Sequence, residues 1–141
     1  MNRISRDQMF MLMATLVARR GTCPRAQVGA LLVKDRRIVS MGYNGAPPGF
    51  KHCTDVGCDE MDGQQGCIRT IHGEANAIAF AARHGIVTAG TTMYCTYSPC
   101  KKCAELMLSA GIIRFVYNRE YRAGALDLLD KGLVSIEQLE V

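Results

Sequence analysis

The chain has 141 residues, 48% of them hydrophobic and 21% charged, a composition that is typical of one globular domain and excludes a disordered or fibrous protein. Lysine and arginine outnumber aspartate and glutamate by 17 to 13, so the net charge of +4 suits a small anionic ligand but falls short of the basic surface of a dedicated polynucleotide binder. No stretch approaches the roughly 20 apolar residues of a membrane helix and the first residues lack a secretory signal, so we expect a soluble, cytoplasmic protein. Seven cysteines in such a protein favour metal binding over disulfides.

The first predicted elements are a helix and a hairpin. The helix spans residues 5–20, with Ser5 as its N-cap and Gly21 as its stop. Its apolar side chains recur with the period of an amphipathic helix, at Met9, Phe10, Leu12, Met13, Leu16 and Val17. Residues 28–33 and 38–43, on either side of a charged turn, predict the two strands of the hairpin, the first of them buried on both faces.

The segment 44–71 shows no periodicity. It contains Gly, Pro, Asp, Gln and the three cysteines Cys53, Cys58 and Cys67. A connection of about 27 residues exceeds the usual length in a compact domain. We therefore expect this long loop to be either disordered or held by something other than a hydrophobic core.

The second half of the chain alternates predicted helices and strands. Ser98 is expected to cap one of these helices, with Pro99 at its first position. The expected order is helix 74–84, strand 91–97, helix 98–109, strand 112–117, a helix near 123–130 and a short segment 134–139. This order predicts a mixed sheet covered by helices on both faces, in one domain over residues 1–141 with the loop 44–71 inserted before the helix that begins at Glu74.

The residue patterns that carry chemistry open two of these helices. His72-Gly73-Glu74 begins one, and Cys100 and Cys103 follow Pro99 at the start of the other. The two cysteines would lie on one helix face, at the positive end of the helix dipole, which favours the thiolates that zinc binds. With His72 as a third ligand, a fourth position stays open for water, as in a catalytic zinc site.

Glu74 is the expected general base. Two thiolates reduce the acidity that zinc gives its water, so a nearby proton acceptor is needed, and Glu74 lies two residues past the histidine ligand. The alternative is that the cysteines form half of a structural zinc site or a redox pair, with His72 unrelated to them. The joint occurrence of both motifs favours the catalytic interpretation.

These motifs resemble those of the cytidine deaminase superfamily, and three further stretches narrow the resemblance to the deoxycytidylate (dCMP) deaminases. The matching stretches are 72–77, 98–103, 23–30, 42–49 and 111–117 together with Tyr121. Gly73 stands where the family usually has alanine, and the last two dozen residues or so match weakly.

The resemblance implies a three-layer α/β/α sandwich around a five-stranded mixed sheet, and hydrolytic deamination of dCMP to dUMP, which supplies thymidylate synthesis. It also implies a homohexamer that is activated by dCTP with Mg²⁺ and inhibited by dTTP. Gly42, Tyr43, Asn44 and Gly45 are the expected allosteric segment, because their backbone amides lie close to the pocket.

The remaining cysteines suggest a second, structural zinc, since a metal can order a loop that has no core of its own. Its candidate ligands are Cys23, Cys53, Cys58 and Cys67. The alternatives are that these thiols are unrelated to one another, or that His52 replaces one of them. Cys95, inside a predicted strand, is interpreted as a buried apolar residue.

Four residues are candidates for substrate binding. The resemblance places Asn44 at the rim of the pocket, where its amide could bond the substrate's sugar or base, although an asparagine before Gly45 also suits an ordinary turn. Arg25, Tyr121 and Arg122 are candidates for the 5′-phosphate, which a guanidinium binds through two hydrogen bonds.

Three competing functions remain at this point. The same zinc and glutamate could serve a free nucleoside, or a base within tRNA or single-stranded nucleic acid. The absence of tryptophan and the 6% of aromatic residues count against nucleic acid, whose bases are bound by stacking. A zinc-stabilised interaction module without turnover would have no use for Glu74.

Overall fold

The computed structural model describes residues 1–58, 69–121 and 125–141. A five-stranded sheet runs through the middle of the molecule in the order β2 (Arg37–Tyr43), β1 (Gly29–Lys34), β3 (Thr92–Tyr97), β4 (Arg114–Arg119), β5 (Ser135–Gln138). β1 is antiparallel to both β2 and β3, whereas β3, β4 and β5 are parallel. The predicted mixed sheet is therefore confirmed.

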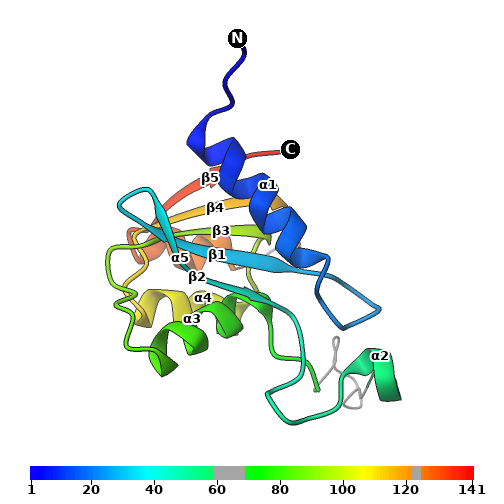
Figure 1. Cartoon of the computed structure of the whole chain (residues 1–141). Coiled ribbons are helices and arrows are strands. Elements are labelled where there is room, and N and C mark those ends of the chain that lie inside the picture. The colour runs from blue at the N-terminus through cyan, green and yellow to red at the C-terminus, as the bar shows by residue number, and fades with distance from the viewer. Residues whose placement is uncertain (59–68, 122–124) are drawn as a thin grey trace.

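Helices cover both faces of this sheet. Helix α1 (Arg6–Ala18) lies across one face (Figure 1), and α3 (Gly73–Arg83), α4 (Lys101–Ser109) and α5 (Leu126–Lys131) lie on the other. The short α2 (Cys53–Val56) stands apart, in the segment between β2 and α3. The predicted three-layer α/β/α architecture is confirmed. None of the described helices combines the length and the apolar character needed to cross a membrane.

Helix α1 begins where the sequence predicts, but its buried face differs. Ser5 and Gln8 form a capping box, each side chain bonding the other's backbone N–H. Phe10, Met11, Ala14 and Ala18 are buried, whereas four of the six apolar residues that set the predicted period are exposed: Met9, Leu12, Met13 and Leu16. The predicted helix is confirmed, but the period does not identify its buried face, because apolar residues surround the whole helix.

Two glycines set how closely helices approach the sheet. A Cβ on Gly29 would lie 2.2 Å from the carbonyl oxygen of Ala14, so α1 packs directly on the backbone of β1. A Cβ on Gly42 would lie 2.5 Å from the Gly73 carbonyl oxygen and from the Ala77 amide nitrogen. Gly42 thereby lets the first turn of α3, which carries Glu74, pack against β2.

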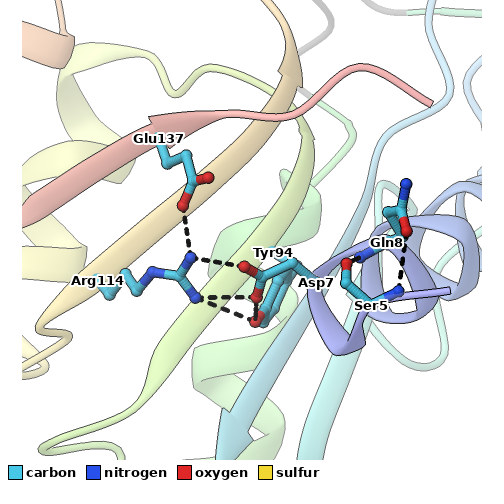
Figure 2. Close-up of polar contacts among 6 residues, drawn as sticks. All are labelled: Ser5, Asp7, Gln8, Tyr94, Arg114 and Glu137. Carbon is cyan, nitrogen blue, oxygen red and sulfur yellow. Dashed lines mark hydrogen bonds and ion pairs between the residues drawn. The ribbon is translucent and has the colours of Figure 1, made fainter.

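A polar network ties α1 to three strands on the same face of the sheet (Figure 2). Arg114 binds Asp7 through two hydrogen bonds of 3.0 and 2.8 Å, and also pairs with Glu137 on β5. The Tyr94 hydroxyl donates to Asp7. Hydrogen bonds from Arg114 lower the pKa of the Asp7 carboxyl, while burial raises the pKa of Tyr94 to about 12.

The start of α4 differs from the prediction. Its N-cap is Cys100 rather than Ser98, and its first residue is Lys101. Ser98 instead continues the sheet, because its backbone N–H donates to the Arg119 carbonyl at 2.9 Å. Tertiary pairing with β4 therefore overrides the local capping preference of serine.

The base of the long loop is closed by backbone pairing. Gly45 and Ile71 exchange two hydrogen bonds of 3.1 and 2.9 Å, forming an isolated antiparallel bridge. Beyond that bridge, Thr54 at α2 donates its N–H to the Thr22 carbonyl at 3.1 Å. Backbone contacts of this kind hold the described part of the loop beside the segment that precedes β1.

Candidate active site

The three predicted ligands of the catalytic zinc come together at two helix N-termini. His72 is the N-cap of α3, Cys100 is the N-cap of α4 and Cys103 lies in its first turn. The His72 Nδ1 atom lies 3.5 Å from the Cys100 Sγ and 3.3 Å from the Cys103 Sγ. All three ligand atoms lie within 4.8 Å of one another.

These distances fit a zinc ion. A tetrahedral zinc with bonds of about 2.3 Å to sulfur and about 2.0 Å to nitrogen holds those two ligand atoms about 3.5 Å apart. The two nitrogen-to-sulfur distances at this site are 3.3 and 3.5 Å. The donor set of two thiols and one imidazole therefore suits zinc in both chemistry and spacing.

The charges within this triad favour a deprotonated sulfur. Hydrogen bonds from Cys103 and then from His72 lower the pKa of Cys100 to about 4, although burial opposes this. The Cys100 thiolate in turn raises the pKa of both His72 and Cys103. A cation in contact with these groups would satisfy the thiolate charge that the geometry already stabilises.

Glu74 lies behind the triad, buried in the first turn of α3 with 4% of its surface exposed. Its Oε1 atom accepts a hydrogen bond from the Cys95 thiol at 3.3 Å. Burial raises the pKa of the Glu74 carboxyl, and its own backbone N–H and Cys95 partly offset that rise. Such a carboxylate can both accept and return a proton.

Cys95 has a polar contact that the sequence did not suggest. The structure confirms that it is fully buried in β3, but its thiol bonds the carboxylate of Glu74. Burial holds the pKa of Cys95 well above its usual range, so the thiol keeps its proton and acts as the donor. No local pattern of residues marks a strand cysteine that meets a helix residue 21 positions earlier in the chain.

A pocket of about 360 Å³ is lined by Glu74 and by two residues of the triad, His72 and Cys100. It includes three of the predicted substrate-binding residues, Arg25, Asn44 and Tyr121, whereas Arg122 lies outside the described residues. The other lining residues are Cys23, Ala26, Val28, Thr70, His72, Glu74, Tyr97, Ser98 and Cys100. The sequence analysis did not identify Tyr97 and Ser98 as pocket residues. Their position just before Pro99 and Cys100 indicates that they lie near the triad.

Asn44 is buried and both ends of its amide bond the protein backbone. Its Oδ1 accepts from the Val28 N–H at 2.7 Å, and its Nδ2 donates to the Ala26 carbonyl at 2.6 Å. Asn44 thus holds the segment that leads into β1. Its contact with a substrate stays a prediction.

The predicted allosteric segment is tied to the active site at both ends. The Asn76 side chain of α3 donates to the Tyr43 carbonyl at 2.6 Å. Gly45 pairs with Ile71, next to His72. Residues 42–45 therefore connect β2, the long loop and the first turn of α3, while their regulatory role stays a prediction.

A second group of metal-type ligands lies beside the pocket. The thiols of Cys23, Cys53 and Cys58 lie within 4.8 Å of one another, and the Sγ atoms of Cys23 and Cys58 are 3.8 Å apart. Two sulfur ligands of a tetrahedral zinc are also about 3.8 Å apart. Three thiols at this spacing fit a zinc ion. Cys67 lies outside the described residues.

His52 makes other contacts than those of a ligand in this group. Its Nδ1 atom lies 2.9 Å from the Thr22 hydroxyl and 3.3 Å from the Ala46 N–H, which donates to it. Among the described residues the group consists of the three cysteines alone. The geometry therefore favours the cysteines over the alternative in which His52 replaces one of them.

A sandwich of this topology with a His/Cys/Cys triad and a buried glutamate at two helix N-termini is the architecture of a zinc-dependent deaminase. Residues 4–119 match the family described as "Cytidine and deoxycytidylate deaminase zinc-binding region". The chain belongs to this family.

Several members of the family are similar to this chain over most of its length. The "ComE operon protein 2" of Bacillus subtilis (strain 168) is 41% identical over 143 residues, covering all of this chain and 75% of that protein. The "Deoxycytidylate deaminase" of Mycobacterium phage D29 is 38% identical over 130 residues, or 85% of this chain and 99% of that protein. The crystal structure of the dCMP deaminase from the cyanophage S-TIM5 in complex with dCMP and dUMP covers 99% of this chain and 100% of that one, with 30% identity and a TM-score of 0.86.

Proposed function

We propose that this chain is a zinc-dependent dCMP deaminase that releases dUMP. The observation that carries this proposal is the buried Glu74 carboxylate beside the His72, Cys100 and Cys103 ligand atoms, with Glu74, His72 and Cys100 lining one pocket. The substrate is proposed because the cyanophage relative binds dCMP and dUMP and the mycobacteriophage relative is named for this activity.

The proposed mechanism assigns a proton-carrying role to Glu74. When bound by His72, Cys100 and Cys103, zinc supplies a Lewis acid that polarises the attacking water. Glu74 accepts a proton from that water as the water oxygen bonds to C4, and donates the proton to N3 of the cytosine ring. Glu74 then carries a second proton from the new C4 hydroxyl to the amino group, which leaves C4 as ammonia. Cys95 holds one oxygen of Glu74 during these steps. With 4% of its surface exposed, Glu74 has little contact with bulk water.

The phosphate of the nucleotide is assigned to Arg25, Tyr121 and Arg122. Arg25 and Tyr121 both line it, and Arg122 follows Tyr121 in the chain. A guanidinium binds a phosphate through two parallel hydrogen bonds, so Arg25 is the main candidate. Asn44 is the proposed contact to the sugar or base.

A substrate panel tests this proposal. Purified, zinc-loaded protein is assayed against dCMP, deoxycytidine, cytidine, dCTP and a tRNA or single-stranded DNA oligonucleotide. We expect kcat/KM for dCMP to exceed that for deoxycytidine by about a hundredfold or more, since the nucleoside lacks the phosphate that Arg25 is proposed to bind. A preference for nucleoside or oligonucleotide would establish one of the alternative functions instead.

We further propose a structural zinc at Cys23, Cys53 and Cys58, with Cys67 as the fourth ligand. The three described thiols have the spacing that zinc requires, and they join the segment before β1 to the short α2. Metal analysis of the native protein should find two zinc ions per chain. A single zinc would remove this proposal.

The family resemblance supports three further proposals: a cytoplasmic homohexamer, a role in supplying dUMP for thymidylate synthesis, and control by dCTP with Mg²⁺ and by dTTP through residues 42–45. The dCMP saturation curve, recorded alone and with each effector, tests the control. We expect a sigmoidal curve that dCTP with Mg²⁺ makes more hyperbolic and dTTP depresses. A hyperbolic curve that neither nucleotide changes would contradict this regulation.

A further inference from the structure

Ser98 is buried at the end of β3 and makes two hydrogen bonds to a single residue. Its Oγ atom accepts from the Tyr121 N–H at 2.7 Å and donates to the Tyr121 carbonyl at 3.0 Å. Its side chain is not the cap of α4, because Cys100 takes that position. With 4% of its surface exposed, Ser98 makes these hydrogen bonds in the protein interior rather than at the surface.

These bonds extend the β3–β4 pairing by side chain rather than by backbone. The regular ladder ends at Tyr97 and Arg119, and the Ser98 N–H adds one backbone bond to the Arg119 carbonyl at 2.9 Å. Tyr121 lies two residues past the end of β4. The Ser98 hydroxyl supplies Tyr121 with both the donor and the acceptor that a neighbouring strand would supply.

The residue held in this way forms part of the pocket. The rings of Tyr97 and Tyr121 meet edge to face, with centroids 6.3 Å apart and planes at 79°. Both residues line the pocket that contains His72 and Glu74. Tyr121 is 39% exposed, so its ring depends on the placement of its main chain more than a buried ring would.

We propose that Ser98 is a positioning residue for substrate binding, whose clamp on Tyr121 holds Tyr97 and Tyr121 together as an aromatic wall against which the nucleotide packs. The proposal rests on the proposed function, since a pyrimidine nucleotide has the flat faces that aromatic rings bind. A wall that is ordered before the substrate arrives reduces the entropy lost on binding. Loss of the clamp should therefore weaken binding more than it slows the chemical step.

The test is Ser98→Ala with Ser40→Ala as its matched control. Ser40 is equally buried, with 3% exposed, and its hydroxyl donates a 2.6 Å bond to the Ala77 carbonyl outside the residues that line the pocket. In Ser98→Ala we expect KM for dCMP to rise about five- to tenfold with less than a twofold change in kcat. Ser40→Ala should change neither, and Ser98→Thr, which keeps a hydroxyl, should recover most of the lost affinity.

Amide hydrogen exchange gives a readout that does not depend on turnover. The Tyr121 amide should exchange at least about tenfold faster in Ser98→Ala than in Ser40→Ala, because its acceptor is gone. If the wild-type protein deaminates dCMP but Ser98→Ala matches Ser40→Ala in KM and in Tyr121 exchange, this inference is overturned while the proposed function stands. Wild-type protein that neither binds nor deaminates dCMP would overturn the proposed function and this inference with it.

Discussion

The two groups of metal-type ligands contain similar ligand atoms but lie on different kinds of secondary structure. His72, Cys100 and Cys103 stand at the N-termini of α3 and α4, and both helices pack on the central sheet. Cys53 lies on a helix of four residues, Cys58 follows that helix and Cys23 precedes β1. The first group is positioned by the hydrophobic core, whereas the second joins segments that have little core of their own.

On our proposal, this difference separates a site for chemistry from a site for stability. The first group has the buried carboxylate of Glu74 beside it, and the second has the Thr70 hydroxyl, 3.2 Å from the Cys53 sulfur. A ligand set backed by rigid elements can bind a metal and keep a catalytic residue in place. A ligand set in a loop contributes its metal-binding free energy to folding.

Glu74→Ala is expected to have the largest effect on activity. Loss of the proton carrier should lower kcat for dCMP by about a thousandfold or more, while the zinc content stays unchanged because Glu74 is not among the three ligand atoms. Kinetics and metal analysis on one sample measure both quantities. Glu105→Ala, at an exposed residue of α4, is the control. Loss of zinc in Glu74→Ala would make Glu74 a ligand instead.

Cys53→Ser should mainly reduce the stability of the protein rather than its catalytic activity. Removal of one ligand of the second group should lower the free energy of unfolding by several kcal/mol, on the order of 3–5, with one zinc lost per chain. Denaturant unfolding and limited proteolysis of residues 44–71 would detect this change. Cys103→Ser, in the first group, is the contrasting variant, and its main expected effect is a loss of activity. Equal stability of Cys53→Ser and the wild type would remove the distinction between the two groups.

Cys95→Ala should reduce activity modestly. Without the thiol donor the Glu74 carboxylate is less well oriented, so kcat should fall about three- to tenfold with little change in KM. Cys95→Ser keeps a hydrogen-bond donor, although its C–O bond is shorter than the C–S bond of cysteine. Its kcat should lie between those of Cys95→Ala and the wild type. Steady-state kinetics with a matching thermal unfolding curve measure this effect. Full activity of Cys95→Ala would return Cys95 to the role of a buried apolar residue.

Asp7→Asn, on the face of the sheet opposite α3 and α4, should change stability alone (Figure 2). Arg114 lowers the pKa of Asp7 in the folded protein, so the ionised carboxylate stabilises the fold above its unfolded pKa of about 4 and loses that contribution as the pH falls through the lower folded value. We expect a cost of about 1 kcal/mol at pH 7, because the pair is partly exposed.

The pH dependence of that cost is the decisive measurement for Asp7. The stability difference between wild type and Asp7→Asn should be constant from about pH 7 to pH 5 and shrink below about pH 4. Glu140→Gln, which removes an exposed carboxyl near the C-terminus, is the control. A difference that does not change with pH would mean that packing rather than charge explains the effect.

Local sequence determined much of this protein. The Ser5 and Gln8 capping box, the hairpin of β1 and β2, and the motifs around His72 and Cys100 each depend on neighbours a few residues away. Capping, strand alternation and ligand spacing act over one or two turns, so the chain itself displays them. Glu74 could be predicted as the general base for the same reason, because it lies two residues past His72. The two ligand groups join residues 28 apart (His72 and Cys100) and 35 apart (Cys23 and Cys58), so the fold decides that they meet.

Tertiary structure decided what depends on distant partners. Which face of α1 is buried follows from its close packing on Gly29, and not from the period of its apolar residues. Ser98 bonds Tyr121 rather than capping a helix, and Cys95 meets Glu74. Each of these contacts joins residues more than ten positions apart, and a side chain with several possible hydrogen-bond partners takes the one that packing brings within reach.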